Sequence, residues 1–246
     1  MNKNVPEPAP LPPAPTHSSF WFAHRRRPVF LLLLVTGLVL FLVWLPGGTR
    51  ASLWTALIAQ RALVVLLSLF ALVTLSLIWS GGQRLDTRIF MLFNNRVYPL
   101  WLDRCMWLAT QLGNMLAAFI AAFLLYILNY RSVAVEVILG TLTLWLLVET
   151  IKALTDRTRP FLDLQGTRII GWRERGRSFP SGHTAQAFFL VTLLSHWFQI
   201  GVGGTVALYA VAALVGFTRM YVGAHYPRDV IGGIVLGSVW GILAML

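Results

Sequence analysis

The sequence predicts an all-α fold, a polytopic membrane helical bundle with a six-helix core and an extra N-terminal helix. Three observations lead to this prediction. Of the 246 residues, 57% are hydrophobic and only 12% are charged, against about a quarter charged in a typical soluble domain. The mean hydropathy is +0.70. Several apolar runs approach the roughly 20 residues that a helix needs to cross a bilayer.

The charge of the chain indicates anionic partners at a membrane rather than nucleic acid. Lys and Arg number 20 against 9 Asp and Glu, a net charge of +11. In a soluble protein this excess would suggest nucleic acid, but here the basic residues lie between apolar runs, where lipid headgroups or phosphates are the expected contacts. The single Cys105 excludes an intrachain disulfide and a metal site built from cysteines.

The N-terminal part divides into a tail and a short membrane unit. Residues 1–28, rich in Pro and ending in a basic cluster, are predicted to be a disordered tail. The apolar run 29–45 lacks a small-x-small cleavage site, so we interpret it as a retained span rather than a signal peptide. With an interfacial segment at 51–61 it forms a unit over 29–61, and the main membrane domain covers 62–246.

Six further apolar runs predict the spans of the main domain, at 62–79, 106–128, 134–154, 183–199, 204–219 and 230–246. Within the second of these, small and polar residues are expected to mark helix packing; they are Thr110, Gln111, Gly113 and Asn114. Alternation of the spans places 81–105, 155–182 and 220–229 on one side of the membrane, so polar residues in these loops are able to meet.

Between the first two of these spans, residues 84–104 alternate charged and aromatic side chains and are too polar to cross the bilayer. An amphipathic helix at the membrane surface is predicted there. It would serve as a tether or, alternatively, as a gate for a lipid tail.

The first polar motif is Lys152 to Pro160. Lys152 and Arg159 are seven residues apart, nearly two helical turns, so we expect both on one face of a helix end. Pro160 disfavours helix at Arg159, which would stop the helix there and leave the guanidinium free to turn inward. Arginine suits bidentate phosphate contact and lysine adds a point charge. The alternative is two boundary cations that snorkel to the interface. Glu149 is expected to pair with Lys152.

The second motif, Pro180-Ser181-Gly182-His183, opens an apolar run. Ser181 is a suitable N-cap, and Gly182 allows a ligand to approach the backbone. Free amides in the first helical turn form an anion site, and His183 there is placed to act as a general acid. A capped helix with an incidental histidine is the alternative.

The third motif joins Arg219 at the end of one span to His225 and Asp229 at the start of the next. Pro227 fits the first helical position, which places Asp229 in the first turn. Asp229 would accept the proton of one ring nitrogen of His225 and leave the other nitrogen exposed for attack. The alternative is an interfacial His–Asp pair that caps a helix.

The loop between the first two motifs, residues 156–179, holds six arginines against three acids. It is either a solvated face or a contact for an anionic headgroup.

Together the three motifs resemble the pattern of the type-2 phosphatidic acid phosphatase superfamily, which includes vanadium haloperoxidases and glucose-6-phosphatase. That pattern is Lys-x6-Arg-Pro, Pro-Ser-Gly-His and Ser-Arg-x5-His-x3-Asp. The chain matches it throughout, except that Thr218 replaces the serine before Arg219. The resemblance covers roughly residues 62–246.

The resemblance implies a role for each motif residue. His225 would be the phosphorylated nucleophile, Asp229 would orient it, and His183 would protonate the leaving oxygen. The phosphate-binding residues implied are Lys152, Arg159, Ser181, Gly182 and Arg219. No metal and no cofactor are required.

The expected function is that of an integral membrane phosphatase acting on a lipid phosphate or diphosphate, such as an isoprenoid diphosphate, phosphatidate, phosphatidylglycerol phosphate or lipid A. A lipid phosphotransferase is an alternative within the family, and a non-enzymatic anion or lipid transporter is an alternative outside it. The expected partners are a membrane lipid and the bilayer, without nucleic acid, and the oligomeric state is left open.

The orientation of the protein in the membrane is predicted in two conflicting ways. With seven spans, the basic cluster at 25–27 shares a side with the motifs, and the positive-inside rule then makes the site cytoplasmic. The resemblance implies an extracytoplasmic site in a bacterial plasma membrane. Phosphate-binding cations should be discounted from the count of basic residues, but the cluster at 25–27 should not. If 29–45 does not cross, the conflict disappears. We favour the outer face.

Overall fold

The computed structural model describes residues 36, 40, 43, 44 and 46–245, and the chain falls into two compact units, 1–59 and 60–246. The tail predicted at 1–28 and nearly all of the span predicted at 29–45 lie outside the described residues. In the first unit, helix α2 covers Gly47–Ala59, so most of the segment predicted as interfacial is helical. Its place at a membrane surface and the division of the chain at residue 61 remain predictions.

The second unit is built from helices, as predicted. They are α3 Arg61–Ser76, α4 Ser80–Asn94, α5 Leu100–Gln111, α6 Met115–Ile127, α7 Arg131–Thr155, α8 Pro160–Asp163, α9 Gly182–Trp197, α10 Val202–Tyr221 and α11 Pro227–Leu243. Five of the six spans predicted for this unit match α3, α7, α9, α10 and α11 to within a few residues.

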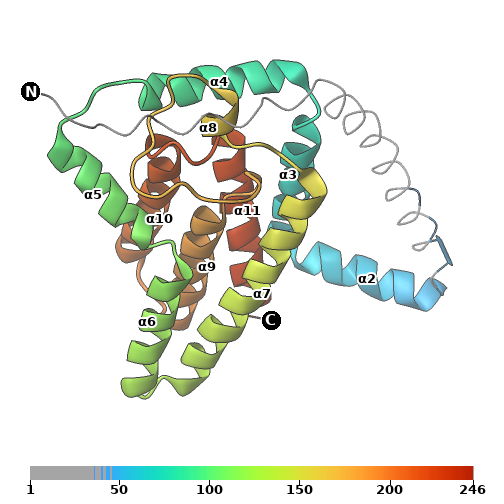
Figure 1. The fold of residues 1–246 in the computed structure, drawn as a ribbon. Coiled ribbons are helices and arrows are strands. Elements are labelled where there is room, and N and C mark those ends of the chain that lie inside the picture. The colour runs from blue at the N-terminus through green and yellow to red at the C-terminus, as the bar shows by residue number, and fades with distance from the viewer. Residues whose placement is uncertain (1–35, 37–39, 41–42, 45, 246) are drawn as a thin grey trace, which may run out of the picture. The chain divides into compact units, whose positions relative to one another are not determined.

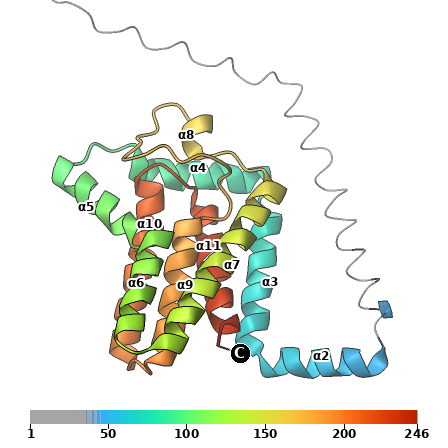
Figure 2. The same cartoon turned by 60° about the horizontal axis from the view of Figure 1, so that its bottom comes forward.

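Helix α9 lies at the centre of this unit, between α7, α10 and α11 (Figures 1 and 2). Nearly all of its residues from Thr184 to Leu193 are buried, as expected for a helix surrounded by others. Glycines at every fourth position of α11 let the two backbones approach closely. A Cβ on Gly233 would stand 2.6 Å from the carbonyl oxygen of Ser181, and one on Gly237 would collide with that of Ala185. The start of α9 is therefore held against α11.

Helix α4 lies across one end of the helices (Figure 2), because the chain bends by 96° between α3 and α4. Its buried residues are spaced four apart on a single face, Gly82, Asp86, Phe90 and Asn94. The single helix predicted over 84–104 is wrong. The segment forms two helices, since Pro99 adopts an extended backbone and begins α5.

The uninterrupted span predicted at 106–128 is also wrong. It breaks between α5 and α6, which meet at 58°. The Asn114 side chain caps α6 by accepting a hydrogen bond from the Ala117 amide at 2.7 Å. At Gly113 a Cβ would lie 2.5 Å from the carbonyl oxygen of His183, so the break packs directly against the start of α9.

The described helices differ in how well they suit a membrane. By length and composition, the segment Arg131–Asp163 and α10 are each able to cross, and the pairs α3–α4 and α5–α6 qualify only as bent spans. The outer faces of α6 and α7 expose large apolar side chains, among them Ile120, Phe123, Leu139 and Leu146. Such faces are typical of contact with lipid.

Candidate active site

The three polar motifs converge at one end of the unit. The end of α7 and the loop after it, the start of α9 and the turn between α10 and α11 meet there (Figure 1). A cavity of about 290 Å³ is lined by residues of all of them, including Lys152, Arg159, Gly182, His183 and His225. The structure thus brings together both predicted histidines and two of the predicted cations.

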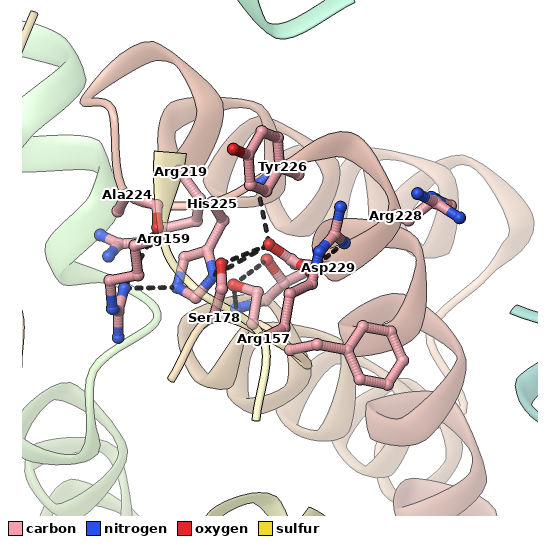
Figure 3. Close-up of polar contacts among 12 residues, drawn as sticks. Arg157, Arg159, Ser178, Arg219, Ala224, His225, Tyr226, Arg228 and Asp229 are labelled. Atoms are coloured by element: carbon pink, nitrogen blue, oxygen red, sulfur yellow. Dashed lines mark hydrogen bonds and ion pairs between the residues drawn. The ribbon is translucent and has the colours of Figure 1, made fainter. Parts of the chain in front are cut away.

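The His225 ring is buried and held from both sides (Figure 3). Its Nε2 lies 3.2 Å from Nη1 of Arg159. A guanidinium is only a donor, so Nε2 is the acceptor in this contact, which assigns the ring proton to Nδ1. The lone pair of Nε2 therefore faces the cavity side, where Arg159 lies.

The opposite nitrogen of this ring faces Ser178 and Asp229. Nδ1 lies 3.5 Å from Ser178 Oγ and 3.7 Å from Asp229 Oδ2. The second distance is longer than a hydrogen bond, so the direct hydrogen bond expected between Asp229 and His225 is not formed. Ser178 Oγ donates to Asp229 Oδ2 at 2.5 Å. Its lone pairs are thus free to accept from Nδ1, and the hydroxyl stands between ring and carboxylate.

Asp229 is anchored by the local structure of α11. Pro227 occupies the first helical position, as predicted, and places Asp229 in the first turn. The backbone amide of Tyr226 donates to Asp229 Oδ2 at 2.8 Å, and Nη1 of Arg157 donates to Oδ1 at 2.5 Å. The carboxylate is fully buried but has a charged partner, which is the condition under which a buried charge is tolerated.

Arg157 connects this carboxylate to α4. Its other guanidinium nitrogen pairs with Asp86, which also accepts from Arg228 Nε at 2.6 Å. The result is an alternating buried network of two carboxylates and two guanidiniums. Through it helix α4 supports the residue that faces His225.

Arg159 does not share a helical face with Lys152, contrary to expectation. Helix α7 ends at Thr155, and Asp156 adopts a left-handed backbone with φ of 50°. Arg159 has the extended backbone predicted for a residue before proline, with φ of −84° and ψ of 153°. Its buried guanidinium donates to the carbonyl oxygens of Gly176 and Ala224 at 3.2 Å, so loop contacts aim it at the cavity.

Arg219 lies in the last turn of α10 and is buried. Its Nη1 donates to Thr110 Oγ1 at 2.7 Å, so a polar residue predicted to mark packing in fact holds a site cation. Within the described residues, Arg219 Nε has no hydrogen-bond partner and remains able to donate. The Thr218 hydroxyl bonds the carbonyl of Val215 at 2.6 Å within the same helix.

The remaining predicted residues take different positions. Ser181 caps α9 as predicted, accepting from the Thr184 amide at 3.4 Å, but its side chain is fully buried and does not line the cavity. Gly182 and His183 do line it. Lys152 also lines it and forms the predicted pair with Glu149, at 2.7 Å.

Glu174, from the loop before α9, lies among the site cations. One carboxylate oxygen is 2.9 Å from Arg159 Nη1 and 3.8 Å from His225 Nε2. The other contacts Arg219 and lies 3.8 Å from His183 Nδ1. Burial alone raises the pKa of this carboxyl, but the charge of Arg219 opposes burial, and the pKa lies well below its usual range. The group is therefore an anion at neutral pH.

Several site residues were not identified from the sequence, namely Asp86, Thr110, Arg157, Glu174 and Ser178. Arg157 and Glu174 were counted only as charges of the 156–179 loop. A usable signal existed for Arg157, which lies inside the first motif, two residues before Arg159. Ser178 gave no periodic or spacing signal.

Comparison with known proteins gives the same family as the motifs. A family model described as the PAP2 superfamily matches residues 133–246. The crystal structure of Aquifex aeolicus LpxE is 32% identical, with a TM-score of 0.58, over 64% of this chain and 93% of that one. The chain belongs to the PAP2 superfamily.

Two further proteins are similar over most of their length. An undecaprenyl-diphosphatase of Sulfolobus acidocaldarius is 27% identical over 71% of this chain and 85% of that protein. A lipid A 4'-phosphatase of Bacteroides thetaiotaomicron is 29% identical over 65% of this chain and 75% of its own. The PAP2-type phosphatidylglycerolphosphate phosphatase of Bacillus subtilis, 24% identical with a TM-score of 0.66 over 74% of this chain and 94% of that one, shares the fold. This PAP2 chain is accordingly an integral membrane protein and a phosphatase.

Proposed function

We propose that this protein removes phosphate from a membrane lipid phosphate or diphosphate through a phosphohistidine at His225. The observation that carries the proposal is the state of the His225 ring. The contact with Arg159 assigns the ring proton to the other nitrogen, and Nε2 faces the carboxylate of Glu174, which Arg159 and Arg219 hold. A nucleophilic lone pair beside an anion-binding pair of arginines suits attack on phosphorus.

The reaction proceeds in two displacements. His225 Nε2 forms a bond to phosphorus while the bond to the leaving oxygen breaks, and His183 gives that oxygen its proton. Water then attacks phosphorus, its proton passes to His183, and the nitrogen–phosphorus bond breaks. Lys152, Arg159 and Arg219 neutralise the phosphoryl oxygens, so the chemistry requires no metal.

The lining of the cavity supports a lipid substrate. Beside the polar groups it includes Met115 on α6 with Leu144, Trp145 and Val148 on α7. These two helices also carry the exposed apolar faces described above. A substrate with its phosphate at Arg159 would thus lay an apolar chain toward α6 and α7.

The test is turnover by purified protein of a panel of isoprenoid diphosphates, phosphatidate, phosphatidylglycerol phosphate and lipid A, in EDTA. The proposal predicts phosphate release that vanadate inhibits, and loss of activity by at least about 10³-fold in His225→Ala. Transfer of the phosphate to a second lipid would identify a phosphotransferase instead. Equal activity of His225→Ala and the unaltered protein would refute the proposal.

A further inference from the structure

Glu174 occupies the position that the proposed mechanism assigns to the phosphoryl group. Each of its carboxylate oxygens faces one arginine and one histidine, Arg159 with His225 and Arg219 with His183. A tetrahedral phosphate needs the same four groups: two guanidiniums on its oxygens, a nucleophile and an acid. Both cannot occupy the site together, since the guanidinium donors that bind phosphate are those that bind Glu174.

The cavities on either side of Glu174 support the same conclusion. A second cavity of about 280 Å³ adjoins the first, and Asn114, Glu174 and His183 line both. The side chain of Glu174 therefore stands at the junction between the two cavities. Its sequence neighbours Trp172, Arg173, Arg175 and Arg177 are all exposed. Outward movement of this part of the loop would expose little apolar surface.

We propose that Glu174 is a specificity-determining residue, and this inference rests on the proposed function. Its carboxylate is a resident anion that the terminal phosphate of the substrate must displace. A membrane presents phosphodiester lipids, each with one negative charge, in large excess over any phosphomonoester. A tethered carboxylate of equal charge competes with them at an effective concentration in the millimolar range. A terminal phosphate carries about −1.5 to −2 charges at pH 7, so it binds the two arginines more strongly and displaces the carboxylate.

A catalytic role is the competing explanation. Glu174 lies 3.8 Å from both histidine rings, and a carboxylate there could instead activate water. The two explanations predict different effects on anion affinity and turnover when the carboxylate is removed. Removing a competitor tightens anion binding and preserves turnover, whereas removing a catalytic base lowers turnover and does not tighten binding.

The experiment compares the full-length protein with Glu174→Gln, which keeps the size of the side chain and removes its charge. Glu136→Gln is the matched control, because Glu136 lies near the other end of α7 with Trp197 as its partner. Dissociation constants for vanadate are measured by calorimetry, and kcat, KM and inhibition by phosphatidylglycerol are measured in mixed micelles.

We expect Glu174→Gln to bind vanadate roughly tenfold more tightly, equivalent to about 1.4 kcal/mol, and to gain inhibition by phosphatidylglycerol. Its kcat should stay within about threefold of the unaltered protein. Should Glu174→Gln not fold, Glu174→Asp, one methylene shorter, must show the same two changes to a smaller extent.

Vanadate affinity that is unchanged or weaker would overturn the proposal, as would a kcat that falls a hundredfold. Failure of the proposed function is a separate result. In that case the unaltered protein releases no phosphate from any lipid of the panel, whatever Glu174→Gln does to vanadate binding.

Discussion

At the scale of single residues, the site depends on how the His225 ring is held. Arg159 determines which nitrogen carries the proton, and Ser178 connects the other nitrogen to Asp229. The ring and the carboxylate could be predicted from their spacing along the chain. The serine could not, because its place between them depends on the path of the preceding loop, and no local pattern encodes that path.

Replacing Ser178 with alanine should lower kcat by about 10- to 100-fold, because a buried hydrogen bond to a charged partner contributes roughly 1.5–3 kcal/mol. KM should change little, since the hydroxyl lies behind the ring rather than in the cavity. Ser178→Thr, which retains the hydroxyl, should recover part of the loss. Ser195→Ala removes another buried hydroxyl from the chain and serves as the control. Equal kcat in Ser178→Ala and Ser195→Ala would show that the hydroxyl does not position the ring.

At the scale of elements, α4 is part of the site rather than a tether alone. Its buried Asp86 pairs with Arg157 and Arg228, and Arg157 in turn pairs with Asp229. The amphipathic character of this segment was correctly predicted from its alternating charged and aromatic residues. Its buried carboxylate was not, because a charge on an amphipathic helix ordinarily faces solvent.

Changing Asp86 to asparagine removes the negative charge that pairs with the buried guanidinium of Arg157 and the partly buried one of Arg228. Breaking a buried ion pair in this way costs about 3–5 kcal/mol, so the variant should unfold at clearly lower temperature in detergent. Asp156→Asn tests the exposed pair with Arg177, where the expected loss is about 0–1 kcal/mol. Equal unfolding temperatures of Asp86→Asn and Asp156→Asn would show that the network does not stabilise the packing of α4.

The positions of helices were easier to predict than their interruptions. Apolar runs located α7, α9, α10 and α11 to within a few residues, because burial and lipid contact both require them. The break at Gly113 and Asn114 lies inside such a run. There the single capping side chain of Asn114 begins a new helix among residues that are otherwise mostly apolar. The end of α7 at Thr155 precedes the proline that was expected to end it, since the left-handed Asp156 terminates the helix first.

At the scale of the whole molecule, the alternation of the predicted spans indicated that the three polar motifs could meet, and the structure brings most of their residues to one cavity. We propose that the cavity opens on the extracytoplasmic side of the membrane.

Leu162, exposed in α8, offers a position at which to test this orientation. With Cys105 changed to serine, Leu162→Cys should react in intact cells with a thiol reagent that does not cross the membrane. Arg131→Cys, at the start of α7 and so at the opposite end of that helix from the site, should be protected until the membrane is opened. The reverse pattern of labelling would place the site in the cytoplasm.

The most direct measurement of the central claim is capture of the phosphorylated enzyme. The protein is mixed with a lipid that it hydrolyses, labelled in the terminal phosphate, and the reaction is quenched in alkali within milliseconds. The label should then be found on the peptide containing His225. The label should be stable in alkali and lost in acid, and His225→Ala should hold none. Label found on Glu174 or His183, or turnover without any captured phosphate, would contradict the account.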